Sequence, residues 1–177
     1  MKDIRWSQIA LFSSLGPAEI ERVAPIFGRK SLKAGENLVV EGEPGDEMFV
    51  LIEGRVRVTK SMVMRGMSLP LTELASPRKV LASFSGDDYP VFGDIAMMDR
   101  DVRSATVEVV ADATFLVTDR ERFFALAAAE PAIGVKLLTA IGRSLSGKVR
   151  RNNEDLVKLT TALALALGRS MEHRGGS

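Results

Sequence analysis

Residues 33–59 read KAGENLVVEGEPGDEMFVLIEGRVRVT, and three glycine-containing turn sequences divide this stretch at regular intervals. The turns are Lys33–Glu36, Glu43–Asp46 and Glu53–Arg55. Between them lie short apolar runs, and Val56–Thr59 alternates apolar and polar residues, which is the pattern of a half-buried strand. Turns that recur about every ten residues are typical of an all-β sandwich or barrel. The stretch therefore predicts a mainly β fold.

The same pattern extends towards both ends of the chain. Further strands are expected near residues 69–74, 79–84, 104–110 and 113–117. Segment 61–77 is less regular, and we interpret it as an extended hairpin or a mobile loop whose role the sequence does not indicate.

Helical sequences flank the predicted strands. Gly16 followed by Pro17 is typical of a helix start, and Thr118–Glu121 is a capping box that starts a short helix ending at Ala129. Pro131 then begins a long helix. We expect four parts in sequence: an N-terminal helical segment (1–25), a β domain with the short helix (26–130), the long helix (131–168) and a flexible tail (169–177).

The long helix carries a heptad seam. Its members are spaced 4, 3, 4, 3, 4 and 3 residues apart, and they are Leu145, Val149, Asn152, Leu156, Leu159, Leu163 and Ala166. A narrow apolar seam pairs helices side by side, and the polar Asn152 can fix the register across a dimer axis. We therefore expect a homodimer; the alternative is that the seam packs on the chain's own β domain.

Composition excludes several classes of function. There are no cysteines, which removes disulfides and thiolate metal sites, and the single histidine is His173 in the polar tail. Histidine metal clusters and a Ser-His-Asp triad in the β domain are excluded with it. The net charge is +1, and no apolar run approaches the roughly 20 residues of a spanning helix. We expect a cytoplasmic protein without a membrane span, a cofactor or direct nucleic-acid contact.

Residues 92–106, FGDIAMMDRDVRSAT, combine groups that suit a phosphate. Gly93 allows a close backbone approach to a ligand, and the amides that open the turn Ile95–Met98 can point at an anion. Asp94 can accept a hydrogen bond from a hydroxyl, and Arg103 is a fork-shaped cation nine residues later. From the residues alone the choice stays open between a sugar-phosphate site and a solvated loop.

This stretch resembles the phosphate-binding cassette of cyclic-nucleotide-binding domains, the family of catabolite activators, protein kinase A regulatory subunits and cyclic-nucleotide-gated channels. The family pattern is Phe-Gly-Glu, apolar residues around a small one, a variable loop, then Arg, a small residue and Ala. The spacing from Gly93 to Arg103 matches without a gap, and the resemblance covers residues 11–156. It implies an eight-stranded, jelly-roll-like β-roll with an N-terminal helix and a long C-terminal helix. It also implies a regulatory module and not an enzyme.

The resemblance assigns roles around the cyclic phosphate. Arg103 would pair with the phosphate, and Ser104 would add a hydrogen bond. The backbone amides of Ile95 and Ala96 would do the same.

The sugar and the base have their own expected contacts. Asp94 would bind the ribose 2′-hydroxyl, while Gly93 and Ala105 would leave room for the ligand. The long helix would cover the base, with Arg151 as a candidate base contact or, alternatively, a solvated arginine. Cyclic AMP is the expected ligand and cyclic GMP the alternative, and the output would reach an unidentified protein effector.

Three features depart from the family pattern. Asp94 replaces the usual glutamate, and losing its hydrogen bond would weaken binding by roughly 1.5–3 kcal/mol, about tenfold or more. Segment Gly86–Val91 is longer than usual, and its Tyr89 can line or block the pocket. The threonine-serine pair that caps adenine in the catabolite activators is not evident.

Two alternative functions follow. One is a degenerate, ligand-free domain for dimerisation or docking. The other is a truncated transcription factor, disfavoured because a helix-turn-helix needs roughly 60 more residues than Arg169–Ser177 supplies. Acids near the cassette also suggest a metal cluster, but the interspersed arginines favour a solvated surface with no metal. These acids are Asp87, Asp88, Asp94, Asp99 and Asp101.

Overall fold

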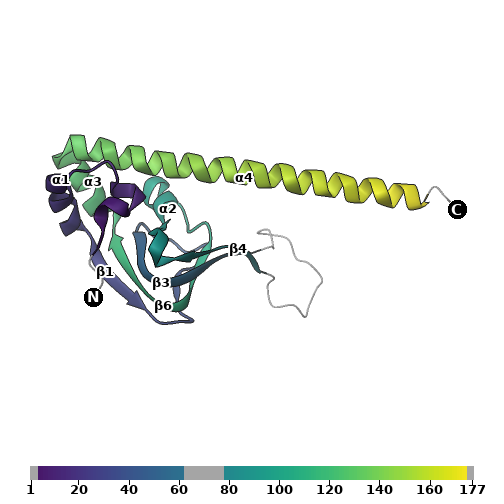
Figure 1. Cartoon of the computed structure of the whole chain (residues 1–177), viewed down its shortest axis with the longest axis horizontal. Helices are drawn as coiled ribbons and strands as arrows, with labels where there is room; N and C mark the ends of the chain where they lie inside the picture. Colours follow the sequence, from purple (N-terminus) through teal and green to yellow (C-terminus); the bar gives the residue numbers. More distant parts are fainter. Residues whose placement is uncertain (1–3, 62–77, 175–177) are drawn as a thin grey trace. The chain divides into compact units, whose positions relative to one another are not determined.

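The computed structural model describes the backbone of residues 4–61 and 78–174, and the side chains of these residues except 163 and 166–174 (Figure 1). The chain divides into two compact units, residues 1–140 and 141–177. Four short 3-10 helices (Trp6–Gln8, Ala10–Phe12, Ala24–Ile26, Gly86–Asp88) accompany the main elements. These are α1 (Pro17–Val23), β1 (Gly28–Leu32), β2 (Asn37–Val39), β3 (Met48–Ser61), β4 (Arg78–Ser85), β5 (Val91–Phe92), α2 (Asp94–Asp99), β6 (Thr106–Thr118), α3 (Arg120–Ala129) and α4 (Pro131–Arg174).

The first unit is built around two long antiparallel strands, β3 and β6, that pair along most of their lengths. One half of this pair is flanked by β1 on β6 and by β5 on β3. The other half is flanked by β2 on β6 and by β4 on β3. All pairs are antiparallel, so the described residues form one antiparallel sheet of six strands.

A bend divides β3 and β6 into these halves. The register shifts three times between Leu51 and Val56, and Gly54 has a φ of 90°. A Cβ on Gly54 would lie 2.6 Å from the Cα of Ala113, so only glycine fits this close approach. The bend lets both arms of the sheet enclose a common interior.

The described residues form six strands, where the resemblance implies eight for the whole domain. Residues 48–52 and 56–59 were predicted as two strands but are arms of the single strand β3, and 104–110 and 113–117 likewise belong mostly to β6. The glycine in the Glu53–Arg55 sequence produces a bend within a strand, where a turn between strands was predicted. The strand expected at 69–74 and most of segment 61–77 lie outside the described residues.

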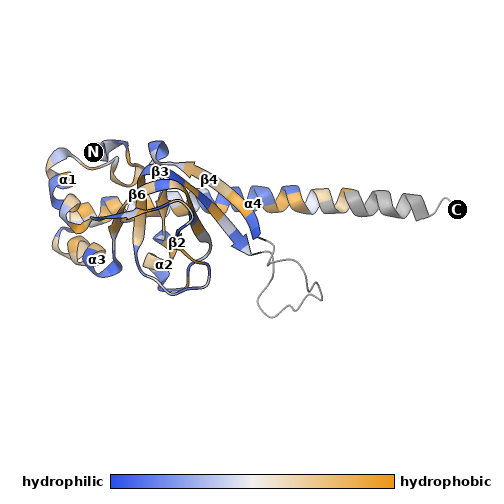
Figure 2. Cartoon of the chain, turned by 90° about the horizontal axis from the view of Figure 1, so that it is seen from below, coloured by the Kyte–Doolittle hydropathy of each residue, from blue (hydrophilic) through white to orange (hydrophobic). Residues whose placement is uncertain are grey.

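The core is filled from both arms of the sheet. Hydrophobic residues are spread along the strands of the sheet (Figure 2), and the five apolar residues 48–52 of β3 are all buried. The Phe49 and Phe115 rings meet edge to face with their centroids 6.4 Å apart. The buried cluster contains Leu38, Phe49, Leu51, Val56, Phe92, Val107, Val109, Ala113 and Phe115.

The helix starts follow the sequence signals with one correction. Pro17 is the first residue of α1, and α3 ends at Ala129, as predicted. Thr118 was predicted to cap α3, but the cap is Asp119, whose carboxylate accepts from the Arg122 amide at 2.8 Å. Thr118 instead closes β6, where its hydroxyl is buried without a hydrogen-bond partner.

Ion pairs tie α1 to the later helices of the first unit. The Lys136 ammonium, in the first turns of α4, lies 2.7 Å from both carboxylate oxygens of Glu19. Arg22 pairs with Glu130, which stands between α3 and α4. The hydrogen bond from Lys136 lowers the pKa of Glu19, and a further one from the Gly16 amide acts in the same direction.

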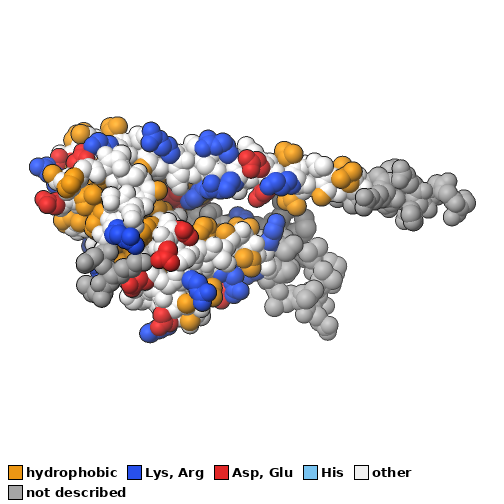
Figure 3. Space-filling view, in the orientation of Figure 1, with side chains coloured by type: hydrophobic (Ala, Val, Ile, Leu, Met, Phe, Trp, Pro, Cys, Tyr) orange, Lys and Arg blue, Asp and Glu red, His pale blue; other side chains and the backbone are white. Residues whose placement is uncertain are grey.

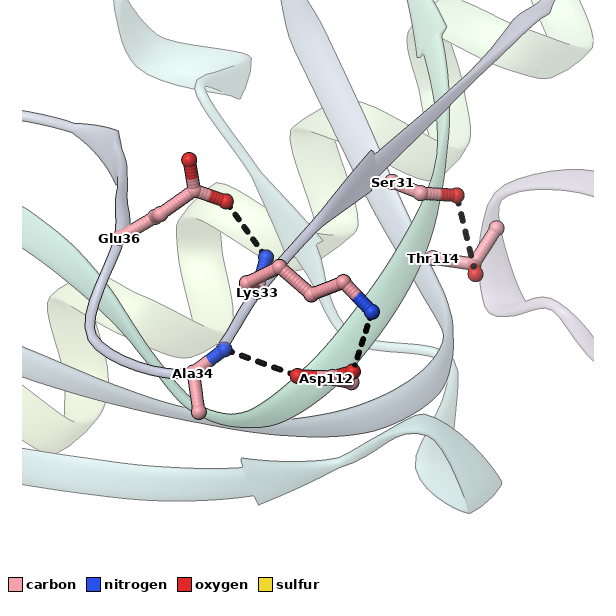
Figure 4. A network of polar contacts seen from close by, with 6 residues as sticks. All are labelled: Ser31, Lys33, Ala34, Glu36, Asp112 and Thr114. Atoms are coloured by element: carbon pink, nitrogen blue, oxygen red, sulfur yellow. Dashed lines mark hydrogen bonds and ion pairs between the residues drawn. The ribbon is translucent and has the colours of Figure 1, made fainter.

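A second polar network closes the turn between β1 and β2 (Figure 4). The Asp112 carboxylate lies 2.8 Å from the Lys33 ammonium and accepts from the Ala34 amide at 3.0 Å. Hydrogen bonding to Lys33 lowers the pKa of Asp112, and the same contact raises the pKa of Lys33. The network fixes the turn against β6 at the bend of the sheet.

The second unit contains the remainder of α4. Apolar side chains stand at the surface of this helix beside lysine and arginine side chains (Figure 3). Of the predicted seam, Val149 is 57%, Leu156 60% and Leu159 58% exposed, while the side chain of Leu163 lies outside the described part. None of the helices described is both long enough and apolar enough to cross a lipid bilayer.

Candidate functional site

The site forms where α2 follows β5. Gly93 adopts a φ of 78° and caps the N-terminus of α2, so the chain turns sharply out of the sheet. A Cβ on Gly93 would lie 2.7 Å from Nη1 of Arg103 and would also collide with the carbonyl oxygen of Glu47. Gly93 and Arg103, ten residues apart in sequence, are therefore in direct contact.

Arg103 is held against the loop that precedes β3. Its Nη1 donates to the Glu47 carbonyl at 2.7 Å, and its Nη2 lies 3.9 Å from the Glu47 carboxylate. The backbone is fixed as well, because the Arg103 amide donates to Glu43 and its carbonyl accepts from Gly42, both at 2.9 Å. A Cβ on Gly45 would lie only 2.5 Å from Nη2, so glycine is what lets the loop cover the guanidinium.

The guanidinium is a buried positive charge. Arg103 is only 5% exposed, and its Cζ lies 5.7 Å from the centroid of the Phe49 ring. Burial lowers the pKa of Arg103, while the negative charges of Glu47 and Asp46 act in the opposite direction. An arginine stays protonated nonetheless, and a buried charge is stable only when it is paired. Among the described residues its side chain donates one hydrogen bond and forms one long ion pair, so fewer than half of its five donors are engaged.

The other residues of the predicted cassette follow Gly93 directly. Asp94 is the first residue of α2 and is buried, with an exposed fraction of 2%. Ala96 is buried, while Ile95 is 37% exposed. The structure thus brings Asp94 next to the Gly93–Arg103 contact.

Ser104 and Ala105 follow Arg103 and lead into β6. Ser104 is exposed, and its carbonyl accepts from the Lys60 ammonium at 2.9 Å. Lys60 also lies 3.9 Å from the Glu41 carboxylate, and the Glu41 amide donates to the buried Thr106 hydroxyl at 3.0 Å. Phe49, near one end of β3, thus contacts Arg103, and Lys60, near the other end, contacts Ser104.

Two further expectations concern the surroundings of the cassette. Tyr89 is 5% exposed and has a φ of 47°. Its ring is buried beside β5, and its hydroxyl has no hydrogen-bond partner among the residues that the structure describes. The acids considered as a metal cluster do not converge: no group of three or more potential metal ligands occurs in the part of the chain that the structure describes.

Arg151 belongs to the second unit and is exposed on α4. Its contact with a base, like the pairing of the α4 seam, stays a prediction.

Several contact residues were not predicted from the sequence. Glu47 holds Arg103 through its backbone carbonyl, which every residue possesses, so no sequence signal marks it. Gly45 was recognised only as part of a turn. Lys60 and Arg120, which contacts the end of α2, lie in unremarkable strand and helix sequences.

Comparisons with known proteins point to one domain family. The family model described as the cyclic nucleotide-binding domain matches residues 29–130. The chain is 25% identical over 135 residues to the cyclic AMP receptor protein of Thermus thermophilus, covering 76% of this chain and 56% of the receptor. It is 28% identical over 131 residues to a cyclic nucleotide-gated potassium channel of Rhizobium etli, covering 72% of this chain and 32% of the channel. The chain thus spans a third to just over half of these curated relatives.

Among solved structures, the catabolite activator protein of Thermus thermophilus superposes with a TM-score of 0.70 at 22% identity. The match covers 85% of this chain and 63% of that one. At this identity the superposition shows a shared fold.

Proposed function

This chain belongs to the cyclic nucleotide-binding domain family, and we propose that it is a non-catalytic regulatory module that binds a cyclic mononucleotide. The supporting observation is the buried Arg103 guanidinium, which lies against Gly93 and Gly45 and, among the described residues, donates only one hydrogen bond from its side chain. A phosphate diester has one negative charge and two exocyclic oxygens, which suit the planar donor fork of arginine. Cyclic AMP is the proposed ligand, with cyclic GMP as the alternative.

The remaining contacts are proposed around the pair formed by Arg103 and the cyclic phosphate. Ser104 and the amides of Ile95 and Ala96 would add hydrogen bonds to the phosphate. The carboxylate of Asp94, a residue that is only 2% exposed, would accept from the ribose 2′-hydroxyl. Gly93 and Ala105 would leave room for the ligand, and Arg151 would contact the base.

Signalling is proposed to proceed through a homodimer. The described seam side chains Val149, Leu156 and Leu159 are each more than half exposed in the single chain, which favours their burial against a second copy. Nucleotide binding would alter this dimer and, through it, a protein effector. For this to occur the nucleotide must bind one of two states more tightly than the other.

Calorimetric titration with cyclic AMP and cyclic GMP tests the proposal, with 5′-AMP as the acyclic control. We expect saturable binding of a cyclic nucleotide that Arg103→Ala weakens by at least tenfold, roughly the value of a hydrogen bond to a charged group. Arg100→Ala is the matched control, since it removes an exposed arginine from the same segment and should change the affinity little.

The contrary result is the absence of heat at millimolar nucleotide from folded protein. Aspartate at position 94, where the family pattern has glutamate, favours the alternative that the domain binds no ligand and serves only dimerisation or docking. Equal weakening by the two arginine variants would instead indicate a general charge effect and would remove the specific role of Arg103.

A further inference from the structure

The short helix of the cassette depends on contacts from outside itself. α2 has six residues, well below the roughly 12–15 that an isolated helix needs. In its last turn the Arg100 amide donates to the Ala96 carbonyl at 3.0 Å. The carbonyls of Met97 and Met98 follow, and at a helix end such groups have no intrahelical donor.

Arg120, the first residue of α3, supplies the missing donors. Its Nη1 donates to the Met98 carbonyl at 2.9 Å and also to the Met97 carbonyl. Its Cζ lies 4.4 Å from the centroid of the Phe124 ring, one turn along α3. The stacked ring holds the planar guanidinium in the orientation that reaches both carbonyls.

The position of the Arg120 charge does not stabilise α3. A cation at a helix N-terminus opposes the helix dipole, whereas a cation at a C-terminus is favourable. The start of α3 is already capped by the Asp119 carboxylate. The favourable interaction of Arg120 is therefore the one with the C-terminus of α2.

We infer that Arg120 is a positioning residue that couples the cassette helix to α3. α2 lies between Gly93 and the segment that carries Arg103, and α3 passes through Glu130 into α4. A change in α2 when an anion binds would reach α3 through this side chain. The ligand-dependent part of this inference rests on the proposed function; the contact itself does not.

The contact lies at the surface of the molecule. Arg120 and Phe124 line an open cavity of about 840 Å³, together with Arg100 and Gly45. The Arg120 side chain is only partly buried, so replacing it should not open the core.

A ligand-free measurement tests the contact. Amide hydrogen exchange by NMR should be about tenfold faster at the Arg100 amide in Arg120→Ala than in wild type, because the last turn of α2 loses a charged donor. Arg122→Ala is the matched control, since Arg122 lies on the same helix with its side chain 62% exposed and pairs only with Asp119 among the described residues. Unchanged exchange at Arg100 in Arg120→Ala would overturn the inference. If Arg120→Ala does not fold, Arg120→Lys is measured in its place. This variant keeps the charge but not the donor fork, so the exchange rate at the Arg100 amide should rise by an intermediate factor. A wild-type exchange rate at Arg100 in Arg120→Lys would contradict the inference.

A second measurement adds saturating cyclic AMP. In wild type and in Arg122→Ala, the nucleotide should change exchange both in residues 93–103 and in α3. In Arg120→Ala the change should be confined to residues 93–103, and an undiminished response of α3 would refute the coupling. A wild-type protein that binds no nucleotide would contradict the proposed function, while the ligand-free measurement would still decide the contact.

Discussion

Substituting Gly45 by alanine should separate ligand binding from folding. The added Cβ would lie 2.5 Å from Nη2, 2.6 Å from Nε and 2.8 Å from Cζ of Arg103. An ordinary contact needs about 3.5 Å, so the guanidinium must move by roughly 1 Å. Gly45 does not have a positive φ, so alanine adds no backbone strain there.

The two consequences differ in size. The atoms that move are the flexible end of a side chain, so the free energy of unfolding should fall by about 1 kcal/mol or less. A shift of roughly 1 Å exceeds the narrow range of hydrogen-bond lengths, so the bonds to the phosphate should be lost. That loss corresponds to roughly 1.5–3 kcal/mol, and cyclic AMP should bind about ten- to a hundredfold more weakly.

Calorimetric titration and urea denaturation of the same samples measure both quantities. Gly28→Ala is the control, because its Cβ would meet the Val117 side chain at an ordinary 3.6 Å. It should change neither quantity appreciably. A folded Gly45→Ala protein that binds cyclic AMP with wild-type affinity would refute the reasoning that the position of the Arg103 guanidinium determines binding.

Three other predictions concern the bend, the β1–β2 turn and the α4 seam. Gly54→Ala should lower the free energy of unfolding, measured by urea denaturation, by about 1–3 kcal/mol more than Gly35→Ala does. Both glycines have a φ near 90°, but only at Gly54 would the added Cβ meet backbone atoms. Equal losses of stability in the two variants would contradict the close approach at Gly54. Asp112 has a lowered pKa, so its contribution to stability is present above its unfolded pKa of roughly 3.9 and is lost as the pH falls through the lower folded value. The stability difference between wild type and Asp112→Asn, measured by denaturation at several pH values, should therefore shrink in acid; a constant difference would argue against the ion pair. Leu156→Glu should give a monomer in sedimentation velocity and Val157→Glu, outside the seam, a dimer; the same result for both would contradict the heptad assignment.

The cassette could be predicted through the family resemblance, because Gly93, Asp94 and Arg103 lie within eleven residues and their spacing matches the family pattern without a gap. The residues alone left the choice open between a sugar-phosphate site and a solvated loop. The partners of Arg103 could not be predicted in the same way. Glu47 lies 56 residues away and contributes a backbone carbonyl, which has no sequence signature.

The continuity of β3 and β6 could not be predicted from the sequence either. Glu53-Gly54-Arg55 has the composition of a turn, but here the glycine bends one strand so that both arms stay paired with β6. Local sequence does not distinguish these outcomes, because the difference depends on the strand that lies opposite.

The N-cap of α3 lies one residue after the predicted position for a related reason. Thr118 and Asp119 are both good N-cap residues. Pairing of Thr118 with Met48 keeps Thr118 in β6, and the cap falls to Asp119.

The central claim, that Arg103 binds the cyclic phosphate, is tested most directly by phosphorus NMR of cyclic AMP during titration with the protein. We predict a change in the phosphorus resonance that saturates with wild type and with Arg100→Lys and is strongly reduced with Arg103→Lys, which keeps the charge but loses the donor fork. A resonance that does not respond to folded wild-type protein, or that responds equally with Arg103→Lys, would contradict the account.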